Sequence, residues 1–161
     1  MAEAWAFAFA PASEDDFERL LALRIQVMRE HLERLGRFDP ARARQRFRDN
    51  FVAEHMRLIM VGDDLAGCVA LLPDQAGLEL SNFYLAPEWQ SRGLGGAAMA
   101  AIVNEADAAE RRLHLQVLKL SPALRFYERH GFVKTHEDEW DVYLAREPRA
   151  AALAEAGSNR C

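Results

Sequence analysis

The sequence predicts a mixed α/β domain with a largely antiparallel sheet flanked by helices. Apolar residues recur with helical spacing in some stretches and alternate with polar residues in others. Three strand-like stretches in the middle of the chain are separated only by short turns, which is typical of antiparallel strands. The 161 residues suit one domain. We expect residues 1–145 to form it and residues 146–161, which contain few large apolar side chains, to form a C-terminal tail.

The first third of the chain predicts one strand and two helices. Residues 5–9 alternate large and small side chains, as a half-buried strand does. Ser13 with Asp16 three positions later has the spacing of an N-terminal cap, and it begins a long apolar-striped helix that reaches about residue 35. Residues 39–51, where a capping aspartate precedes a proline, predict a second and shorter helix.

The middle third predicts three strands. Residues 56–61 and 65–72 flank a glycine-aspartate turn and predict a hairpin, and residues 78–85 predict the next strand. The apolar phase of this last strand slips by one residue near Ser81 and Asn82, which one bulged residue explains. Bulges often lie beside active sites, but an irregularity without functional meaning explains the slip equally well.

A glycine-rich turn from Gln90 to Gly96 leads into a predicted helix over residues 97–111. Glycines let the backbone approach a ligand, and the free N–H groups of a helix start favour an anion such as pyrophosphate. Arg92 adds a cation and Ser91 a hydroxyl. A helix start that merely needs small residues is the alternative. The turn has neither the Gly-Lys-Ser/Thr ending of a P-loop nor a three-glycine dinucleotide fingerprint.

The last third predicts a strand, a helix and two further strands. Residues 113–117 alternate as a strand does, and Ser121-Pro122 begins a helix that runs to His130. Residues 132–135 and 140–144 are the closing strands, on either side of an acidic turn. The predicted order is therefore β-α-α-β-β-β-α-β-α-β-β.

Two blocks of the sequence resemble the GNAT family of N-acetyltransferases. Residues 85–96 contain Gln-Ser-Arg-Gly-Leu-Gly and are similar to the family's acyl-CoA signature, Gln/Arg-x-x-Gly-x-Gly/Ala. Residues 118–132 are similar to its late strand, helix and Tyr-x-x-x-Gly-Phe ending, and the element order over residues 5–144 is similar as well. The resemblance implies a GNAT-like acyl-CoA N-acyltransferase fold. It also implies an acetyltransferase that moves an acetyl group from acetyl-CoA, its cosubstrate, directly to an amine of a small molecule or peptide.

The resemblance also implies the residues of the site. Backbone groups of the bulged strand and the glycine-rich turn would hold acetyl-CoA, and a backbone N–H near Phe83 would polarise the thioester carbonyl. Ser121 stands where the family often has an asparagine near the CoA arm, although it also caps a helix. The implied cofactor-binding residues are Phe83, Tyr84, Leu85, Gln90, Ser91, Arg92, Gly93, Leu94, Gly95, Gly96 and Ser121.

Two catalytic residues follow from the same resemblance. Tyr127 matches the tyrosine that protonates the departing CoA thiolate, and a core aromatic is the alternative reading. Glu79 matches a glutamate that deprotonates the acceptor amine. The alternatives are a solvent-facing strand residue at Glu79 and ordered water as the base.

Composition argues against several other classes of function. The net charge of −5 and the pI near 5.6 disfavour binding to nucleic acid or to an anionic membrane surface. No apolar run approaches the roughly 20 residues of a bilayer span, and the start of the chain has no basic leader, so we expect a cytoplasmic protein. Cys68, Cys161 and the scattered histidines predict no metal site and no covalent nucleophile. The 18 arginines beside 2 lysines reflect GC-rich coding and suggest a bacterial source.

The sequence leaves the acceptor open. Glu79, Ser81, Asn82 and the acidic turn over residues 137–139 favour a small cationic amine over a protein acceptor. The arginines between residues 34 and 48 predict a solvated surface, with contact to an anionic acceptor as the alternative. The alternative function is an acyl-CoA-binding sensor or interaction module without catalysis. The oligomeric state is equally open, with a homodimer as one alternative.

Overall fold

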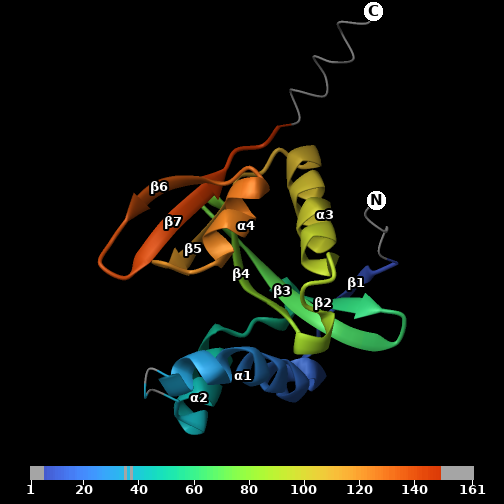
Figure 1. Cartoon of the computed structure of the whole chain (residues 1–161). Helices are drawn as coiled ribbons and strands as arrows, with labels where there is room; N and C mark the ends of the chain where they lie inside the picture. Colours follow the sequence, from blue (N-terminus) through green and yellow to red (C-terminus); the bar gives the residue numbers. More distant parts are fainter. Residues whose placement is uncertain (1–5, 35, 37, 150–161) are drawn as a thin grey trace, which may run out of the picture. The chain divides into compact units, whose positions relative to one another are not determined.

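The structure, a computed structural model, describes residues 6–34, 36 and 38–149 (Figure 1). Within these ranges the strands form a seven-stranded sheet in the order β1-β2-β3-β4-β5-β7-β6. The strands are β1 (Ala8–Pro11), β2 (Met56–Val61), β3 (Asp64–Asp74), β4 (Gly77–Leu85), β5 (Leu113–Leu118), β6 (Val133–Glu137) and β7 (Asp141–Arg146). The α-helices are α1 (Phe17–Arg34), α2 (Pro40–Asn50), α3 (Leu94–Ala108) and α4 (Ala123–Arg129), and the 3-10 helices are η1 (Glu14–Asp16), η2 (Ala53–His55) and η3 (Pro87–Trp89).

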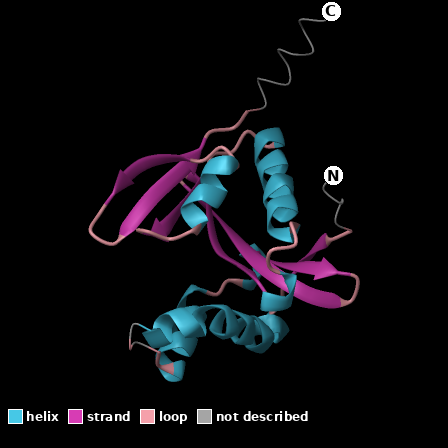
Figure 2. Cartoon of the chain, viewed as in Figure 1, coloured by secondary structure: helices cyan, strands magenta, loops and turns pink. Residues whose placement is uncertain are grey.

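The predicted mixed α/β fold and the predicted order of strands and α-helices are confirmed (Figure 2). The pairs β1–β2, β2–β3, β5–β7 and β6–β7 are antiparallel, and β4 pairs with β5 in parallel. The chain divides into two compact units. The first contains residues 1–71 and 81–95, and the second contains residues 72–80 and 96–161.

The first strand differs from its prediction. It was expected over residues 5–9, but β1 begins at Ala8 and includes Pro11, while residue 5 lies outside the described residues. The strand pairs with β2 from Ala8 opposite Met60 to Pro11 opposite Arg57. A proline is tolerated there because β1 is an edge strand of the sheet. Alternation of side chains therefore located the strand only to within about three residues.

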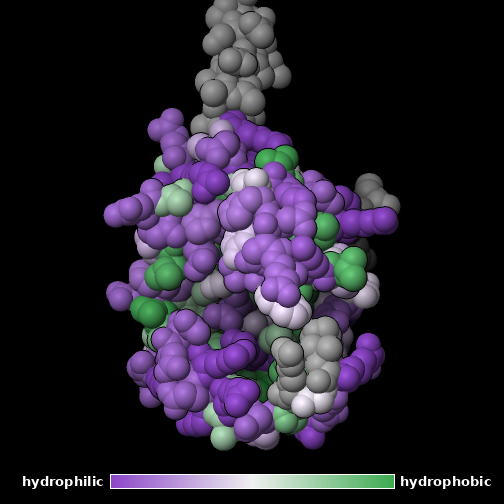
Figure 3. Space-filling view, turned by 90° about the vertical axis from the view of Figure 1, so that its left-hand side faces the viewer, coloured by the Kyte–Doolittle hydropathy of each residue, from purple (hydrophilic) through white to green (hydrophobic). Residues whose placement is uncertain are grey.

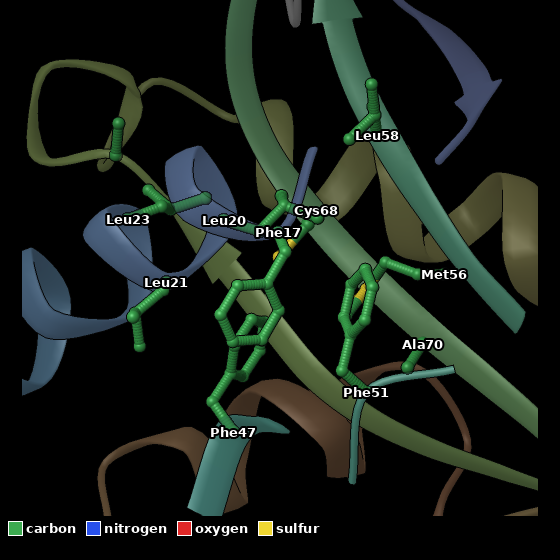
Figure 4. Close-up of a cluster of buried hydrophobic side chains, with 11 residues drawn as sticks. Phe17, Leu20, Leu21, Leu23, Phe47, Phe51, Met56, Leu58, Cys68 and Ala70 are labelled. Atoms are coloured by element: carbon green, nitrogen blue, oxygen red, sulfur yellow. The ribbon is translucent and has the colours of Figure 1, made fainter. Parts of the chain in front are cut away.

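The core of the first unit lies between helices α1 and α2 and the β2–β3 hairpin (Figure 4). The rings of Phe17, Phe47 and Phe51 form a triangle with centroids 5.3 to 5.5 Å apart. Leu20 and Cys68, both fully buried, belong to the same cluster. The helices present this face because their apolar residues recur every three or four positions. The caps predicted for both helices are present: the Ser13 N–H donates to Asp16 at 2.8 Å, and the Asp39 side chain accepts from the Ala41 N–H at 3.0 Å.

Two arginines of α2 connect it to the start of α1. Arg48 forms an ion pair with Glu14 at 2.7 Å, and Arg44 forms one with Glu18. The Arg48 guanidinium also lies 4.0 Å from the centre of the Phe17 ring. These side chains are exposed, so the prediction of a solvated surface is confirmed for them.

The second unit is organised around a buried ion pair. Arg146, 5% exposed, donates to both oxygens of Asp107 at the end of α3, at 2.6 and 3.2 Å, and to the His130 carbonyl that follows α4 at 3.0 Å. The Arg149 N–H also donates to Asp107, at 2.9 Å. Residues 146 and 149, which the sequence analysis assigned to the tail, are both bound by the Asp107 carboxylate. Residues 150–161 lie outside the described residues.

One face of the molecule is mostly polar. Figure 3 shows one face on which hydrophilic side chains predominate and hydrophobic ones are scattered. None of the described helices combines the length and hydropathy that a bilayer crossing requires.

Candidate active site

Strand β4 is irregular where the sequence predicted a bulge. Asn82 has a φ of +48°, in the left-handed region that asparagine enters more easily than most residues. Its carbonyl lies 3.3 Å from the Cys68 thiol on β3, and burial raises the pKa of that thiol to about 12. Cys68 is therefore a buried packing residue whose thiol is protonated at neutral pH.

Strands β3 and β4 approach each other very closely beyond this point. A Cβ atom at Gly67 would lie 2.2 Å from the Tyr84 carbonyl oxygen and 2.7 Å from the Leu85 side chain. Only glycine fits this contact without a shift of the backbone. Residues 84 and 85, both predicted to bind acetyl-CoA, can therefore lie this close to β3 only because residue 67 is a glycine.

The turn after β4 is braced by two of the predicted cofactor-binding residues. The Gln90 side chain donates to the Leu85 carbonyl at 2.9 Å. Arg92 donates to the Glu88 carbonyl at 3.1 Å, and its guanidinium lies 4.8 Å from the centre of the Trp89 ring. The two side chains thus hold the turn in shape, which sequence spacing alone did not indicate.

Helix α3 begins earlier than predicted. It starts at Leu94 and not at residue 97, and it ends at Ala108 and not at residue 111. Gly95 and Gly96 are therefore its second and third residues. In the turn before the helix, Ser91 and Gly93 have φ values of +59° and +87°. The N–H groups of a first helical turn have no partner within the helix, so they can bind an anion.

The first turn of α3 carries no side chain at two successive positions. Gly95 and Gly96 present backbone without side chains, and the nearest atom to a Cβ built at Gly96 is His130 Nε2 at 4.0 Å. Leu94 is fully buried and anchors the helix start. The N–H groups and bare backbone of a helix start match the chemistry of a diphosphate.

Tyr127 lies on α4 and is 8% exposed. Its ring makes edge-on contacts with Phe126 and Phe132, with centroids 5.3 and 5.6 Å away. Ser121 accepts a hydrogen bond from the Ala123 N–H at 3.1 Å, and the N-cap of α4 is Pro122, one residue later than predicted. Aromatic packing therefore holds the ring of Tyr127 in place independently of any role of its hydroxyl.

His130 is the C-cap residue of α4. Burial lowers its pKa, and the neighbouring charges of Arg129 and Arg146 lower it further. Its ring packs 4.8 Å from the centre of Phe126. The neutral imidazole is therefore the favoured form near pH 7, because two arginines supply positive charge beside it.

Glu79 is half-buried on β4 and lies opposite His114 of the parallel strand β5. Residues paired in this way point to the same face of the sheet. His114 Nε2 lies 2.8 Å from Asp74 Oδ2. Burial raises the pKa of Asp74, but hydrogen bonds from His114 and from the backbone outweigh it, and the pKa lies below its usual value. The structure thus places a histidine–carboxylate pair beside Glu79, which spacing could not reveal.

A second polar cluster, also not predicted, lies at the irregular residue of β4. Asn82 Oδ1 accepts from Arg24 of α1 at 3.3 Å and from the Tyr84 hydroxyl at 3.4 Å. Burial raises the pKa of Tyr84, and the Arg24 charge partly offsets this effect. The sequence did contain a signal for the cluster, because Arg24 falls one helical turn after Leu20 and Leu21 on an apolar face.

The predicted site residues divide between the two units. Tyr127, Glu79, Gly96 and Ser121 belong to the second unit, and the other predicted cofactor-binding residues, from Phe83 to Gly95, belong to the first. Within the first unit, the cofactor-binding residues lie on one continuous segment from the irregular strand to the start of α3. The described part of the chain brings together no group of three His, Cys, Asp or Glu side chains able to hold a metal ion.

Comparison with known proteins gives the same fold. A protein from Pyrococcus horikoshii superimposes with a TM-score of 0.72 at 17% identity, over 89% of this chain and 99% of that one. The PaiA N-acetyltransferase of Thermoplasma acidophilum, solved in complex with coenzyme A, gives 0.71 at 16% identity, over 88% and 99%. An acetyltransferase from Thermus thermophilus gives 0.69 at 19% identity, over 89% and 98%.

At the level of sequence, no curated protein is significantly similar to the chain. The profile of the acetyltransferase (GNAT) domain nevertheless matches residues 48–134, which include the glycine-rich turn, α3 and α4. Because this match covers more than half of the sequence, the chain belongs to the GNAT acetyltransferase family.

Proposed function

We propose that the protein is an N-acetyltransferase that moves an acetyl group from acetyl-CoA directly to an amine of a small molecule or peptide. Membership of the GNAT family supports acetyl transfer in general. The observation that carries the proposal for this chain is the first turn of α3, which contains Gly95 and Gly96. It follows a turn in which Ser91 and Gly93 have left-handed backbone conformations. This arrangement suits the pyrophosphate of a CoA thioester.

The proposal assigns cofactor binding mainly to backbone groups. N–H groups from Ser91 to Gly96 would bind the pyrophosphate, and Gln90 would keep the turn in shape through its hydrogen bond to Leu85. Backbone groups of Phe83 and Leu85 would pair with the pantetheine arm, beyond the irregularity at Asn82. The Phe83 N–H would then stabilise the negative charge that develops on the thioester oxygen.

Two side chains would move protons during the transfer. The acceptor nitrogen forms the new bond to the acetyl carbon as the carbon–sulfur bond breaks, so the nitrogen must lose a proton and the sulfur must gain one. We assign the first proton to Glu79 and the second to the hydroxyl of Tyr127. A phenol of ordinary pKa, about 10, is protonated at neutral pH and can donate to a thiolate whose acid has a pKa of about 8.5.

The acidic turn invoked for a cationic acceptor is engaged elsewhere. Glu137 binds the ammonium groups of Lys119 and Lys134, which lower its pKa to about 2. Asp138 accepts from two backbone N–H groups of its own turn and from the Tyr143 hydroxyl at 2.8 Å. Because two of the three carboxylates of the turn are engaged in these contacts, we assign Glu79 and not the turn to the acceptor ammonium.

The test is an acetyl-CoA turnover screen across chemically diverse amines, read by release of the thiol, with wild type and Tyr127→Phe. The substitution keeps the packed ring, so CoA affinity should hold while kcat at saturating acetyl-CoA falls by roughly 10²- to 10⁴-fold. Tyr143→Phe is the matched control, because Tyr143 is a surface tyrosine bound to Asp138, and it should leave kcat unchanged.

Two outcomes contradict the proposal in different ways. An unchanged kcat in Tyr127→Phe, with chemistry shown to be rate-limiting, makes Tyr127 a core aromatic only. Tight CoA binding without thiol release for any amine favours the sensor or interaction module instead.

A further inference from the structure

Arg24 occupies the apolar face of helix α1. The residues three and four positions before it are Leu20 and Leu21, and those three and four positions after it are Val27 and Met28. Leu20 and Leu21 are buried in the core of the first unit, and Arg24 itself is half-buried. A cation on this face of an amphipathic helix is unusual, because arginine is seldom buried without a partner of opposite charge.

The other arginines of α1 all have such a partner. Arg19 forms an ion pair with Asp16, Arg29 with Glu33, and Arg34 with Glu30, each three or four residues away. Arg24 has no carboxylate at these spacings, and it forms no ion pair with any residue that the structure describes. The exposed arginines of this helix are thus paired, whereas the half-buried one is not.

The contacts of Arg24 are all to neutral groups. Its guanidinium donates to Asn82 Oδ1 at 3.3 Å and lies 5.8 Å from the centre of the Phe47 ring. The Tyr84 hydroxyl lies 3.4 Å from the same Asn82 oxygen and 3.5 Å from Met28 Sδ. One amide oxygen therefore serves two donors, and most of the five N–H groups of the guanidinium have no acceptor among these contacts.

We propose that Arg24, assisted by the Tyr84 hydroxyl, binds a carboxylate of the acceptor, so that the acceptor is an amino acid or a similar amine that also bears a carboxylate. The inference rests on the proposed function, because it names the substrate class of the same site. Asn82 and Tyr84 flank Phe83, whose N–H is assigned to the thioester, and they lie on the same strand as Glu79.

Charge favours a carboxylate over a phosphate. Arg24 is a single cation, and the groups around it are an amide, a phenol, a thioether and an aromatic ring. Burial keeps both the Tyr84 phenol and the nearby Cys68 thiol protonated at neutral pH. One guanidinium neutralises one carboxylate in a forked pair, whereas a phosphate dianion would keep a surplus charge.

The experiment compares free amino acids with their carboxamides, which are similar in size but lack the negative charge. For wild type we expect kcat/KM for the preferred amino acid to exceed that for its amide by about tenfold or more. Arg24→Met should lower kcat/KM for the acid by about 10- to 100-fold, mainly through KM, and change it for the amide by less than about threefold. Tyr84→Phe should lower kcat/KM for the amino acid several-fold. Arg29→Met, which removes an exposed and paired arginine of the same helix, is the control and should change neither.

Thermal stability separates this role from a structural one. Replacing an unpaired cation on an apolar face by methionine should leave the melting temperature unchanged or raise it. A lower melting temperature together with an equal loss for acids and amides would show that Arg24 only supports the fold. If Arg24→Met does not fold, Arg24→Lys should keep the preference for acids but lower their kcat/KM by about tenfold, because a lysine lacks the fork.

The inference and the proposed function can fail separately. Equal turnover of acids and amides by wild type overturns the carboxylate site and leaves the acetyltransferase intact. In a second case, wild type acetylates no amine, but free amino acids raise its melting temperature and their amides do not. Arg24→Met abolishes this rise. Acetyl transfer is then rejected and the carboxylate site stands. If neither turnover nor stabilisation is seen, both proposals are wrong.

Discussion

The buried ion pair between Asp107 and Arg146 leads to a quantitative prediction for Asp107→Asn. The change keeps the size of the side chain but removes the negative charge, so Arg146, at 5% exposure, remains buried without a counter-charge. Breaking such a pair on one side costs about 3 to 5 kcal/mol. An asparagine oxygen can still accept one of the three hydrogen bonds that Asp107 now receives, so we expect a loss of about 3 kcal/mol. For a chain of this length the melting temperature should then fall by about 6 to 12 °C.

The assay is urea unfolding of both proteins between pH 3 and pH 7, with the slope m checked for constancy. Hydrogen bonds from Arg146 are the main reason why the pKa of Asp107 lies below its ordinary value of 3.8. The stabilisation by Asp107 is therefore complete above pH 3.8 and is lost as the pH falls through the lower, folded-state pKa. The difference between the two proteins should shrink in that acid range.

Glu147→Gln is the matched control, because Glu147 forms an exposed ion pair with Arg112, and it should change stability by less than about 0.5 kcal/mol. A loss below about 1 kcal/mol in Asp107→Asn, or a loss that stays the same down to pH 3, would refute the reasoning.

Three further changes test the candidate site. Gly95→Val places a branched side chain in the first turn of α3 and should weaken CoA binding about tenfold or more, about 1.4 kcal/mol by calorimetry; a folded variant with normal affinity contradicts the assignment. Glu79→Gln should lower kcat/KM by about 10²-fold and flatten its rise with pH, because unassisted attack needs an amine that is already deprotonated; an unaltered pH profile rejects Glu79 as the base. Gly67→Ala puts a Cβ 2.2 Å from the Tyr84 carbonyl and should cost about 1 to 3 kcal/mol in urea unfolding as well as weaken CoA binding; wild-type values for both would show that β4 can move aside at no cost.

Features encoded by neighbouring residues could be predicted from the sequence. The hydrogen bonds at Ser13, Asp39 and Ser121 each involve partners two or three positions away, and each is present. The slip of apolar phase in β4 corresponds to the left-handed Asn82. Periodicity also gave the order of the elements, because strand and helix spacings differ.

The limits of α3 could not be predicted in the same way. Gly95 and Gly96 have low helix propensity, so the sequence suggested a turn at the two residues that instead form the first helical turn. The buried Leu94 before them and the packed helix behind them outweigh this propensity. The outcome brings the predicted anion-binding residues into the helix start itself.

Contacts between distant residues were not predictable. Arg24 and Asn82 are 58 positions apart, and Asp107 and Arg146 are 39 positions apart. No spacing rule connects such pairs, and a single sequence shows only that a charged residue stands on an apolar face. The contact of Arg24 with Asn82 and that of His114 with Asp74 are of this kind.

The pairing of both lysines with Glu137 has a consequence for measuring acetylation. Lys119 and Lys134 are the only side-chain amines of the chain, and one carboxylate holds both. Acetyl groups that reach the enzyme's own side chains can therefore accumulate at two positions only, which keeps the background of a thiol-release assay low. Each such event would also remove an ammonium from Glu137. Mass spectrometry would detect self-modification as an added acetyl group on Lys119 or Lys134, the two partners of Glu137.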